Sequence, residues 1–239
     1  MIIDKIGQLK DWIDQSDNLV FFGGAGVSTE SGIPDFRSTD GIYNMNYSFP
    51  PEIILSHSFF LENTKIFFDF YKERMINLNA NPNITHLKLV ELEELGKLKA
   101  IITQNIDGLH QKAGSKNVIE LHGSILCNRC MKCNKLYDIN NILNSKDIPL
   151  CKCKGIIKPE VVLYEEPLNN QLIKNAIELI SEAEVLIIGG TSLSVYPAAN
   201  MIKFYKGDKL VLINKDKTHM DHMADLLIYS KLGEVFSYI

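Results

Sequence analysis

The sequence predicts an α/β protein in which a parallel sheet is covered by helices on both faces, together with a smaller domain. Short, continuously apolar strands alternate with helices along most of the 239 residues, as in sheets that are buried on both sides. Residues 38–81 and 124–159 break this alternation, and we interpret them as insertions into one core. Polar motifs follow several strands, at the carboxyl ends where ligands bind in such sheets.

The individual elements follow from two hydrophobic patterns. Ile2, Ile6, Leu9 and Ile13 recur at helical spacing and predict the first helix. The continuous apolar run at residues 19–22 predicts a buried strand. By the same patterns, helices are expected over residues 64–76, 83–95, 168–181 and 196–205, and strands over residues 100–103, 118–121, 161–164, 185–188 and 210–213.

A glycine-rich loop, GGAGVSTESGIPDFR, follows the first strand at residues 23–37. Such a turn lets the backbone approach a pyrophosphate, which the N–H groups of the following helix then bind. Gly24 and Gly26 match the first two positions of a dinucleotide fingerprint, but Thr29 stands at the third. No acidic residue ends a second strand about twenty positions later. The loop therefore predicts a nucleotide site that differs from that of an ordinary dehydrogenase.

Composition and charge exclude several classes of protein. The net charge of −4, without a Lys/Arg block, argues against nucleic acid as the main partner. The N-terminal residues are charged too early for a signal peptide, and no apolar run approaches the length needed to span a membrane. These observations predict a cytoplasmic protein that does not bind membranes.

The five cysteines all lie between residues 127 and 153, a clustering that indicates metal binding. Cys127, Cys130 and Cys133 form C-x-x-C-x-x-C, and Cys151 and Cys153 form C-x-C. Two close pairs of thiolates across a short hairpin suit a tetrahedral, structural zinc ion in a zinc ribbon. The spacing alone leaves open whether residues 127 and 130 or residues 130 and 133 supply the first pair. Buried free thiols are the alternative.

Polar residues also follow the later strands. Gln104, Asn105 and Asp107 come after the strand at 100–103, and His122 comes after the strand at 118–121. His122 is a candidate general base, although a single histidine is more often structural. Thr191, Ser192 and Asn214 follow two further strands and suit phosphate or ribose contacts. Ordinary strand-to-loop turns would explain these last three residues equally well.

Taken together, the motifs resemble the sirtuin family of NAD-dependent protein lysine deacylases. The matching segments are GAGVSTESGIPDFR, TQNIDGLH, LHG, the paired cysteines, KPEVVLYEE, GTSLSVYPAA and the strand that ends at Asn214, in the family's order over residues 18–215. The resemblance implies a Rossmann-like NAD-binding domain of residues 1–37, 82–123 and 160–239. It also implies a small domain that combines a helical module, residues 38–81, with a zinc-binding module, residues 124–159.

The resemblance further implies a mechanism and its residues. The acetyl oxygen attacks the nicotinamide ribose, nicotinamide leaves, and His122 takes a proton from a ribose hydroxyl, which gives free lysine and O-acyl-ADP-ribose. Catalysis falls to His122 and Asn105. The implied NAD contacts are Ala25, Thr29, Phe36, Arg37, Gln104, Asn105, Ile106, Asp107, His122, Thr191, Ser192 and Asn214.

The acyl-lysine peptide is expected as an added strand between residues 161–164 and 194–196, with contacts to Val162, Tyr164 and Val195. By resemblance, Cys130, Cys133, Cys151 and Cys153 bind zinc, and Cys127 is the spare. The chain departs from the family at its second, C-x-C pair and at Tyr164-Glu165-Glu166, where Phe-Gly-Glu is common. Glu165 could favour basic peptides through its charge.

One motif in the helical module bears on which acyl group is removed. Tyr71 and Arg74 form the Y-x-x-R motif with which some sirtuins bind succinyl or malonyl carboxylates, although this spacing is common on helices. We expect deacetylation as the main activity because the loop at residues 32–37 resembles that of general deacetylases. Desuccinylation, ADP-ribosyl transfer to protein and NAD sensing without catalysis are the alternatives. A monomer is expected from the family.

Overall fold

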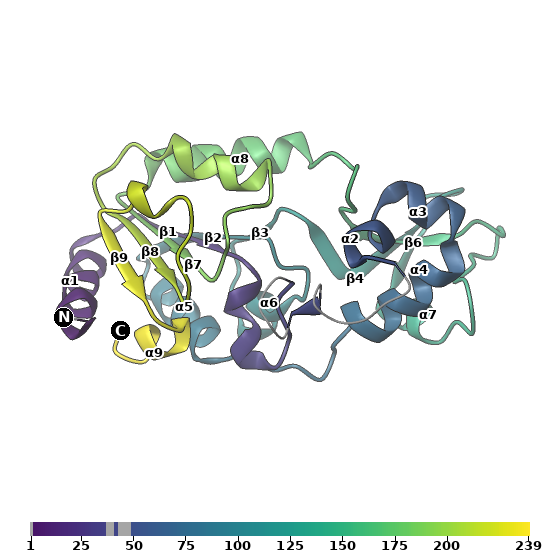
Figure 1. Cartoon of the computed structure of the whole chain (residues 1–239), viewed down its shortest axis with the longest axis horizontal. Coiled ribbons are helices and arrows are strands. Elements are labelled where there is room, and N and C mark those ends of the chain that lie inside the picture. Colours follow the sequence, from purple (N-terminus) through teal and green to yellow (C-terminus); the bar gives the residue numbers. More distant parts are fainter. Residues whose placement is uncertain (1, 37–40, 43–48) are drawn as a thin grey trace.

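A six-stranded parallel sheet forms the larger part of the molecule (Figure 1). The computed structural model describes residues 2–36, 41–42 and 49–239. The strand order is β3-β2-β1-β7-β8-β9, and every neighbouring pair is parallel. The strands are β1 (Leu19–Gly23), β2 (Leu98–Thr103), β3 (Val118–Glu120), β7 (Val185–Gly189), β8 (Leu210–Asn214) and β9 (Leu226–Tyr229).

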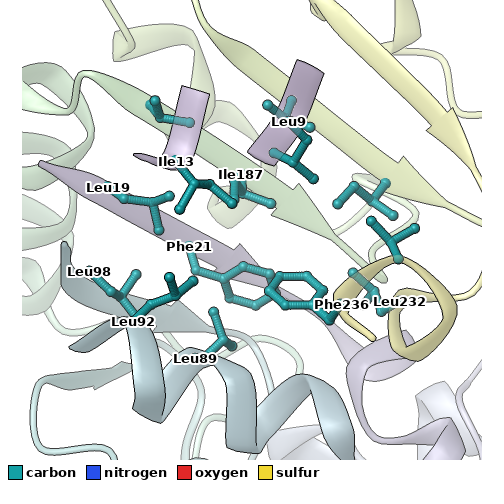
Figure 2. Packing of buried hydrophobic residues seen from close by; sticks show 14 of the residues in the cluster. Leu9, Ile13, Leu19, Phe21, Leu89, Leu92, Leu98, Ile187, Leu232 and Phe236 are labelled. Carbon is teal, nitrogen blue, oxygen red and sulfur yellow. The ribbon is translucent and has the colours of Figure 1, made fainter. Parts of the chain in front are cut away.

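Helices cover both faces of this sheet. Leu19 and Phe21 of β1 belong to a core cluster shared with α1 (Ile2–Gln15), α5 (Ile84–Glu94) and α9 (Leu232–Phe236). Figure 2 shows this cluster, in which the Phe21 and Phe236 rings meet edge to face with centroids 6.0 Å apart. Val20 and Phe22 join a second cluster with α8 (Asn170–Glu182) and the 3₁₀ helix Ala198–Phe204. Burial on both faces explains why β1 is continuously apolar.

A second, antiparallel sheet lies at the other end of the molecule (Figure 1). Its order is β5-β4-β6, with β4 (Gly123–Cys130), β5 (Leu136–Asp138) and β6 (Ile157–Val161). The helices around it are α2 (Pro51–Ile54), α3 (His57–Glu62), α4 (Thr64–Phe70), the π-helical turn Tyr71–Met75 and α7 (Ile139–Leu143). Apolar residues from both predicted insertions share one core cluster here. The predicted fold class is thus confirmed, whereas the exact domain boundaries stay a prediction.

Several elements differ from those expected. The strand expected at 161–164 ends at Val161 and belongs to the antiparallel sheet. The helix expected at 196–205 is a shorter 3₁₀ helix that begins after Pro197. The helix expected at 64–76 continues past Phe70 as a π-helical turn. None of the described helices is long and apolar enough to cross a lipid bilayer.

Candidate active site and metal centre

The loops that follow β1 and β7 meet where the strand order of the large sheet reverses. Parallel sheets bind ligands at this position. The Gly26 N–H donates to the Gly190 carbonyl oxygen over 2.8 Å. A Cβ atom on Gly24 would lie 2.7 Å from the Thr191 Cβ, and one on Gly26 would lie 2.7 Å from the Gly190 Cα. The fingerprint glycines are therefore required for the contact between these two loops.

Ser28, which the sequence analysis did not single out, joins the first loop to the loop after β2. Its hydroxyl donates to the Asp107 carboxylate over 2.7 Å and accepts from the Asn105 amide over 3.1 Å. The Leu109 N–H donates to the other Asp107 oxygen over 2.8 Å. Burial raises the pKa of Asp107, and these two hydrogen bonds to its carboxylate oppose the rise. Ser28 lies within the recognised loop motif, which was the available signal for it.

A second network joins the ends of β2, β7 and β8. The Gln104 amide donates to the Thr191 hydroxyl over 3.0 Å. The Asn214 side chain accepts from the Thr191 N–H over 3.0 Å and donates to the Thr191 carbonyl over 2.9 Å. Asn214 is buried, whereas Ser192 beside this network is exposed. The Asn214 amide thus fixes the backbone of Thr191.

His122 has a defined tautomer. Its Nδ1 lies 2.9 Å from the carbonyl oxygen of Gln104, and because a carbonyl only accepts, Nδ1 carries the proton. Nε2 consequently holds the lone pair. Burial lowers the pKa of His122, and the bond to Gln104 partly opposes this shift. The side chain is therefore neutral at pH 7 and can accept a proton at Nε2.

The remaining predicted cofactor residues are distributed around these two loops. Ala25 and Ile106 are half-buried, and Thr29 is exposed with its hydroxyl bonded to the Gly26 carbonyl over 3.0 Å. Phe36 is half-buried and packs against the core of the antiparallel sheet. Arg37 lies outside the described residues.

The predicted peptide-binding segment, residues 161–164, is fixed within the chain. The Val162 N–H donates to the His122 carbonyl over 2.9 Å, and the Tyr164 N–H donates to the Leu55 carbonyl over 3.0 Å. The Leu163 N–H donates to the Glu166 carboxylate over 2.9 Å. These partners replace a regular strand ladder, which is why the predicted strand at 161–164 is wrong in position. Val195 is half-buried and Tyr164 is exposed.

The Y-x-x-R motif occupies the π-helical turn. Tyr71 is fully buried, stacks on Phe67 at 5.5 Å, and its hydroxyl has no hydrogen-bond partner in the described part of the chain. Burial raises its pKa. Arg74 pairs with Glu73 over 2.8 Å and lines a cavity of about 230 Å³ that reaches Ile33 and Pro34 of the glycine-rich loop.

Four cysteines form a metal-type cluster. The sulfur atoms of Cys130, Cys133, Cys151 and Cys153 all lie within 4.8 Å of one another. The Sγ atoms of Cys130 and Cys153 are 3.5 Å apart, and those of Cys133 and Cys151 are 3.6 Å apart. Zn–S bonds of about 2.3 Å imply sulfur separations of about 3.8 Å in a tetrahedron, so the four side chains fit zinc. Cys127 is exposed and lies outside the cluster, which settles the choice of the first pair.

Comparison with known proteins gives one family. Residues 24–197 match the Sir2 family. A protein of Clostridium tetani named NAD-dependent protein deacetylase is 59% identical, over 99% of this chain and 98% of its own length. A protein of Clostridium acetobutylicum with the same name is 56% identical, over 100% of this chain and 99% of its own length.

Solved structures match nearly the whole chain. A structure described as Sir2 with p53 peptide and NAD+ superposes with a TM-score of 0.87 at 38% identity, covering 98% of this chain and 96% of that chain. A Sir2 mutant with deacetylated p53 peptide and 3'-O-acetyl ADP ribose superposes with a TM-score of 0.90 at 40% identity, covering 97% and 96%. By sequence, fold and cysteine cluster alike, the chain belongs to the Sir2 family.

Proposed function

We propose that this chain is an NAD-dependent protein lysine deacetylase that acts on acetyl-lysine peptides. The observation that carries the proposal is the 2.9 Å contact between His122 Nδ1 and the Gln104 carbonyl oxygen, which places the ring proton on Nδ1 and leaves Nε2 as a base. The names of the relatives and the ligands of the neighbouring structures support the same activity.

The Ser28–Asn105–Asp107 network is assigned to the nicotinamide end of NAD. Asp107 receives the carboxamide, and Ser28 holds the Asp107 carboxylate and the Asn105 amide in place. Gln104, with its amide fixed on Thr191, lies at the ribose. We keep the other predicted NAD contacts, in which Ala25, Thr29, Phe36 and Arg37 come from the glycine-rich loop, Ile106 from the loop after β2, and Ser192 and Asn214 from the ends of β7 and β8.

These residues account for the bond changes and the proton transfer of the proposed reaction. The acetyl oxygen of the substrate attacks the anomeric carbon as the glycosidic bond breaks, and the bond's electron pair leaves with nicotinamide. His122 Nε2 then takes the proton of a ribose hydroxyl, whose oxygen attacks the imidate carbon. The lysine amine then leaves with the proton that His122 accepted as its C–N bond breaks, and water adds to the remaining acyl carbon to give O-acetyl-ADP-ribose. The four cysteines take no part in these steps, because a zinc ion with four thiolate ligands has no open position.

The direct test is to incubate the protein with NAD and acetyl-lysine peptides, and to measure nicotinamide and O-acetyl-ADP-ribose together. Equal amounts of both products are expected. Nicotinamide release with labelled protein in place of O-acetyl-ADP-ribose would instead indicate ADP-ribosyl transfer. NAD binding without release of nicotinamide would indicate a sensor.

The pH dependence of kcat/KM is expected to reflect the protonation of His122. Protonation below its pKa removes the Nε2 lone pair, so the rate falls as the pH falls through that value. Because burial lowers this pKa, the acid limb should lie below the ordinary histidine value of about 6.5. The check is a profile of kcat/KM for the peptide at saturating NAD. An acid limb centred above pH 7 would contradict the assignment.

The Arg74→Met variant is expected to leave the acyl preference unchanged, with acetyl peptides favoured over succinyl peptides before and after the change. A carboxylate clamp needs the Tyr71 hydroxyl, which is buried in the core, and Arg74 already pairs with Glu73. The measurement is kcat/KM for both peptides with both proteins. A selective loss of succinyl turnover in the variant would instead establish the clamp.

We further propose a cytoplasmic monomer whose partners are acyl-lysine proteins, without nucleic acid or membrane partners. The net charge of −4 supports the absence of a nucleic-acid partner. All five cysteines are free thiols, and four of them cluster as metal ligands. This arrangement supports the location of the protein in a reducing compartment.

A further inference from the structure

The segment that follows β6 runs against the beginning of α3. Tyr164 forms an isolated parallel bridge with Ser56. The Tyr164 N–H donates to the Leu55 carbonyl, and the Tyr164 carbonyl accepts from the His57 N–H, each over 3.0 Å. Residues 162–164, the part of the predicted peptide-binding segment 161–164 that follows β6, are thereby held against the helical part of the small domain.

Glu165, directly after this segment, has a left-handed backbone with φ of +75°. A side chain with a Cβ atom rarely adopts this conformation, which glycine adopts without steric penalty. The Glu165 carboxylate accepts two hydrogen bonds from one residue, from the Ser58 N–H over 2.9 Å and from the Ser58 hydroxyl over 3.0 Å. The Ser58 N–H belongs to the first turn of α3, where backbone N–H groups lack helical partners and favour a negative charge.

The neighbouring Glu166 also fixes this segment. Its carboxylate lies 2.8 Å from the His57 Nδ1 and 3.1 Å from the Lys158 Nζ, and it accepts the Leu163 N–H over 2.9 Å. Two consecutive carboxylates thus bind residues 162–164 to the beginning of α3 and to β6. Only the Glu165 contact depends on a residue held in a disfavoured backbone conformation.

We propose that Glu165 is a positioning residue for the peptide substrate. It holds residues 162–164 in the peptide-binding conformation through its two hydrogen bonds from Ser58 in the first turn of α3. This proposal rests on the proposed function. It also replaces the expectation that the Glu165 charge selects basic peptides, because the carboxylate is directed to Ser58 of the chain itself.

The Glu165→Gly variant separates the two possibilities. Glycine suits the left-handed backbone, so the variant is expected to fold while it loses both bonds to Ser58. The KM for an acetyl-lysine peptide should rise roughly tenfold, the effect of losing charged hydrogen bonds, while kcat and the KM for NAD stay the same. The rise should be equal for a basic and an acidic peptide. A rise confined to the basic peptide would establish charge selection and overturn the proposal.

Two further variants and one physical measurement complete the test. Ser58→Ala keeps the backbone bond and should give a smaller rise in peptide KM. Glu165→Gln keeps the size of the side chain but not the charge, and should fall between the parent and Glu165→Gly. Hydrogen exchange at the Ser58 and Tyr164 amides should accelerate in Glu165→Gly. This readout needs no turnover, so it tests the contact even if the proposed activity fails. Unchanged exchange and unchanged peptide KM would overturn the proposal.

Discussion

The His122→Ala variant is expected to lose roughly 10²- to 10⁴-fold in turnover and to retain NAD binding through the remaining contacts. The variant removes the Nε2 lone pair, which is available because Nδ1 donates to the Gln104 carbonyl. The glycine-rich loop and the Ser28–Asn105–Asp107 network stay in place. The measurements are NAD affinity by calorimetry and the rates of nicotinamide and O-acetyl-ADP-ribose formation.

His122→Asn is the matched variant for this experiment. Its amide can still donate a hydrogen bond toward the Gln104 carbonyl but offers no base, so it should be as slow as His122→Ala. His222→Ala, which changes an exposed histidine whose Nδ1 bonds the nearby His219 carbonyl, serves as the control and should retain full activity. Near-normal turnover in His122→Asn would show that another group accepts the proton.

Cys133→Ser is expected to lose zinc, unfold the antiparallel sheet and abolish turnover. Zinc binding to such a site provides about 10–16 kcal/mol of apparent free energy at pH 7, which becomes folding free energy. Activity is lost indirectly. His122 immediately precedes β4, and its carbonyl accepts the N–H of Val162, which follows β6. Unfolding of the antiparallel sheet should therefore displace His122.

Cys127→Ser is the control for the zinc experiment. It removes an exposed thiol outside the four-sulfur cluster and should keep one zinc per chain, the parent melting temperature and full turnover. Zinc content by atomic emission, thermal unfolding and deacetylation are measured on the same preparations. Full activity in a verified zinc-free preparation, or metal loss in Cys127→Ser, would refute the assignment.

The sequence predicted the central strands β1, β7 and β8 of the large sheet well because they are fully buried and therefore carry an unbroken apolar signal. The edge strand β9 alternates between buried and more exposed residues and was not predicted. The antiparallel sheet lacks that signal. β4 is interrupted by polar Asn128 and Arg129, and its partner β6 contains Pro159. β4 is a strand because it pairs with β6, and this long-range contact cannot be inferred from hydrophobic periodicity.

Motifs at strand ends identified the residues of the candidate site, whose roles stay predictions. Contacts between motifs were not predictable. Ser28 bonds Asn105 and Asp107, which lie 77 and 79 residues later in the chain. Glu165 bonds Ser58, which lies 107 residues earlier. His110 shows that a motif does not reveal which of its residues are buried in the core. It ends the recognised TQNIDGLH segment, yet it is buried beside His86, and burial lowers its pKa to about 3.

The order of strands in the large sheet also determines when the protein can begin to fold. The central strand β1 is synthesised first, but its neighbour on one side is β7, which starts at Val185. The Gly24–Gly26 loop packs on Gly190 and Thr191, so its final shape needs a segment made more than 160 residues later. Ribosome-bound chains that stop before β7 should therefore expose β1 and remain dependent on chaperones, whereas release of the last strands should trigger assembly of the sheet in one step.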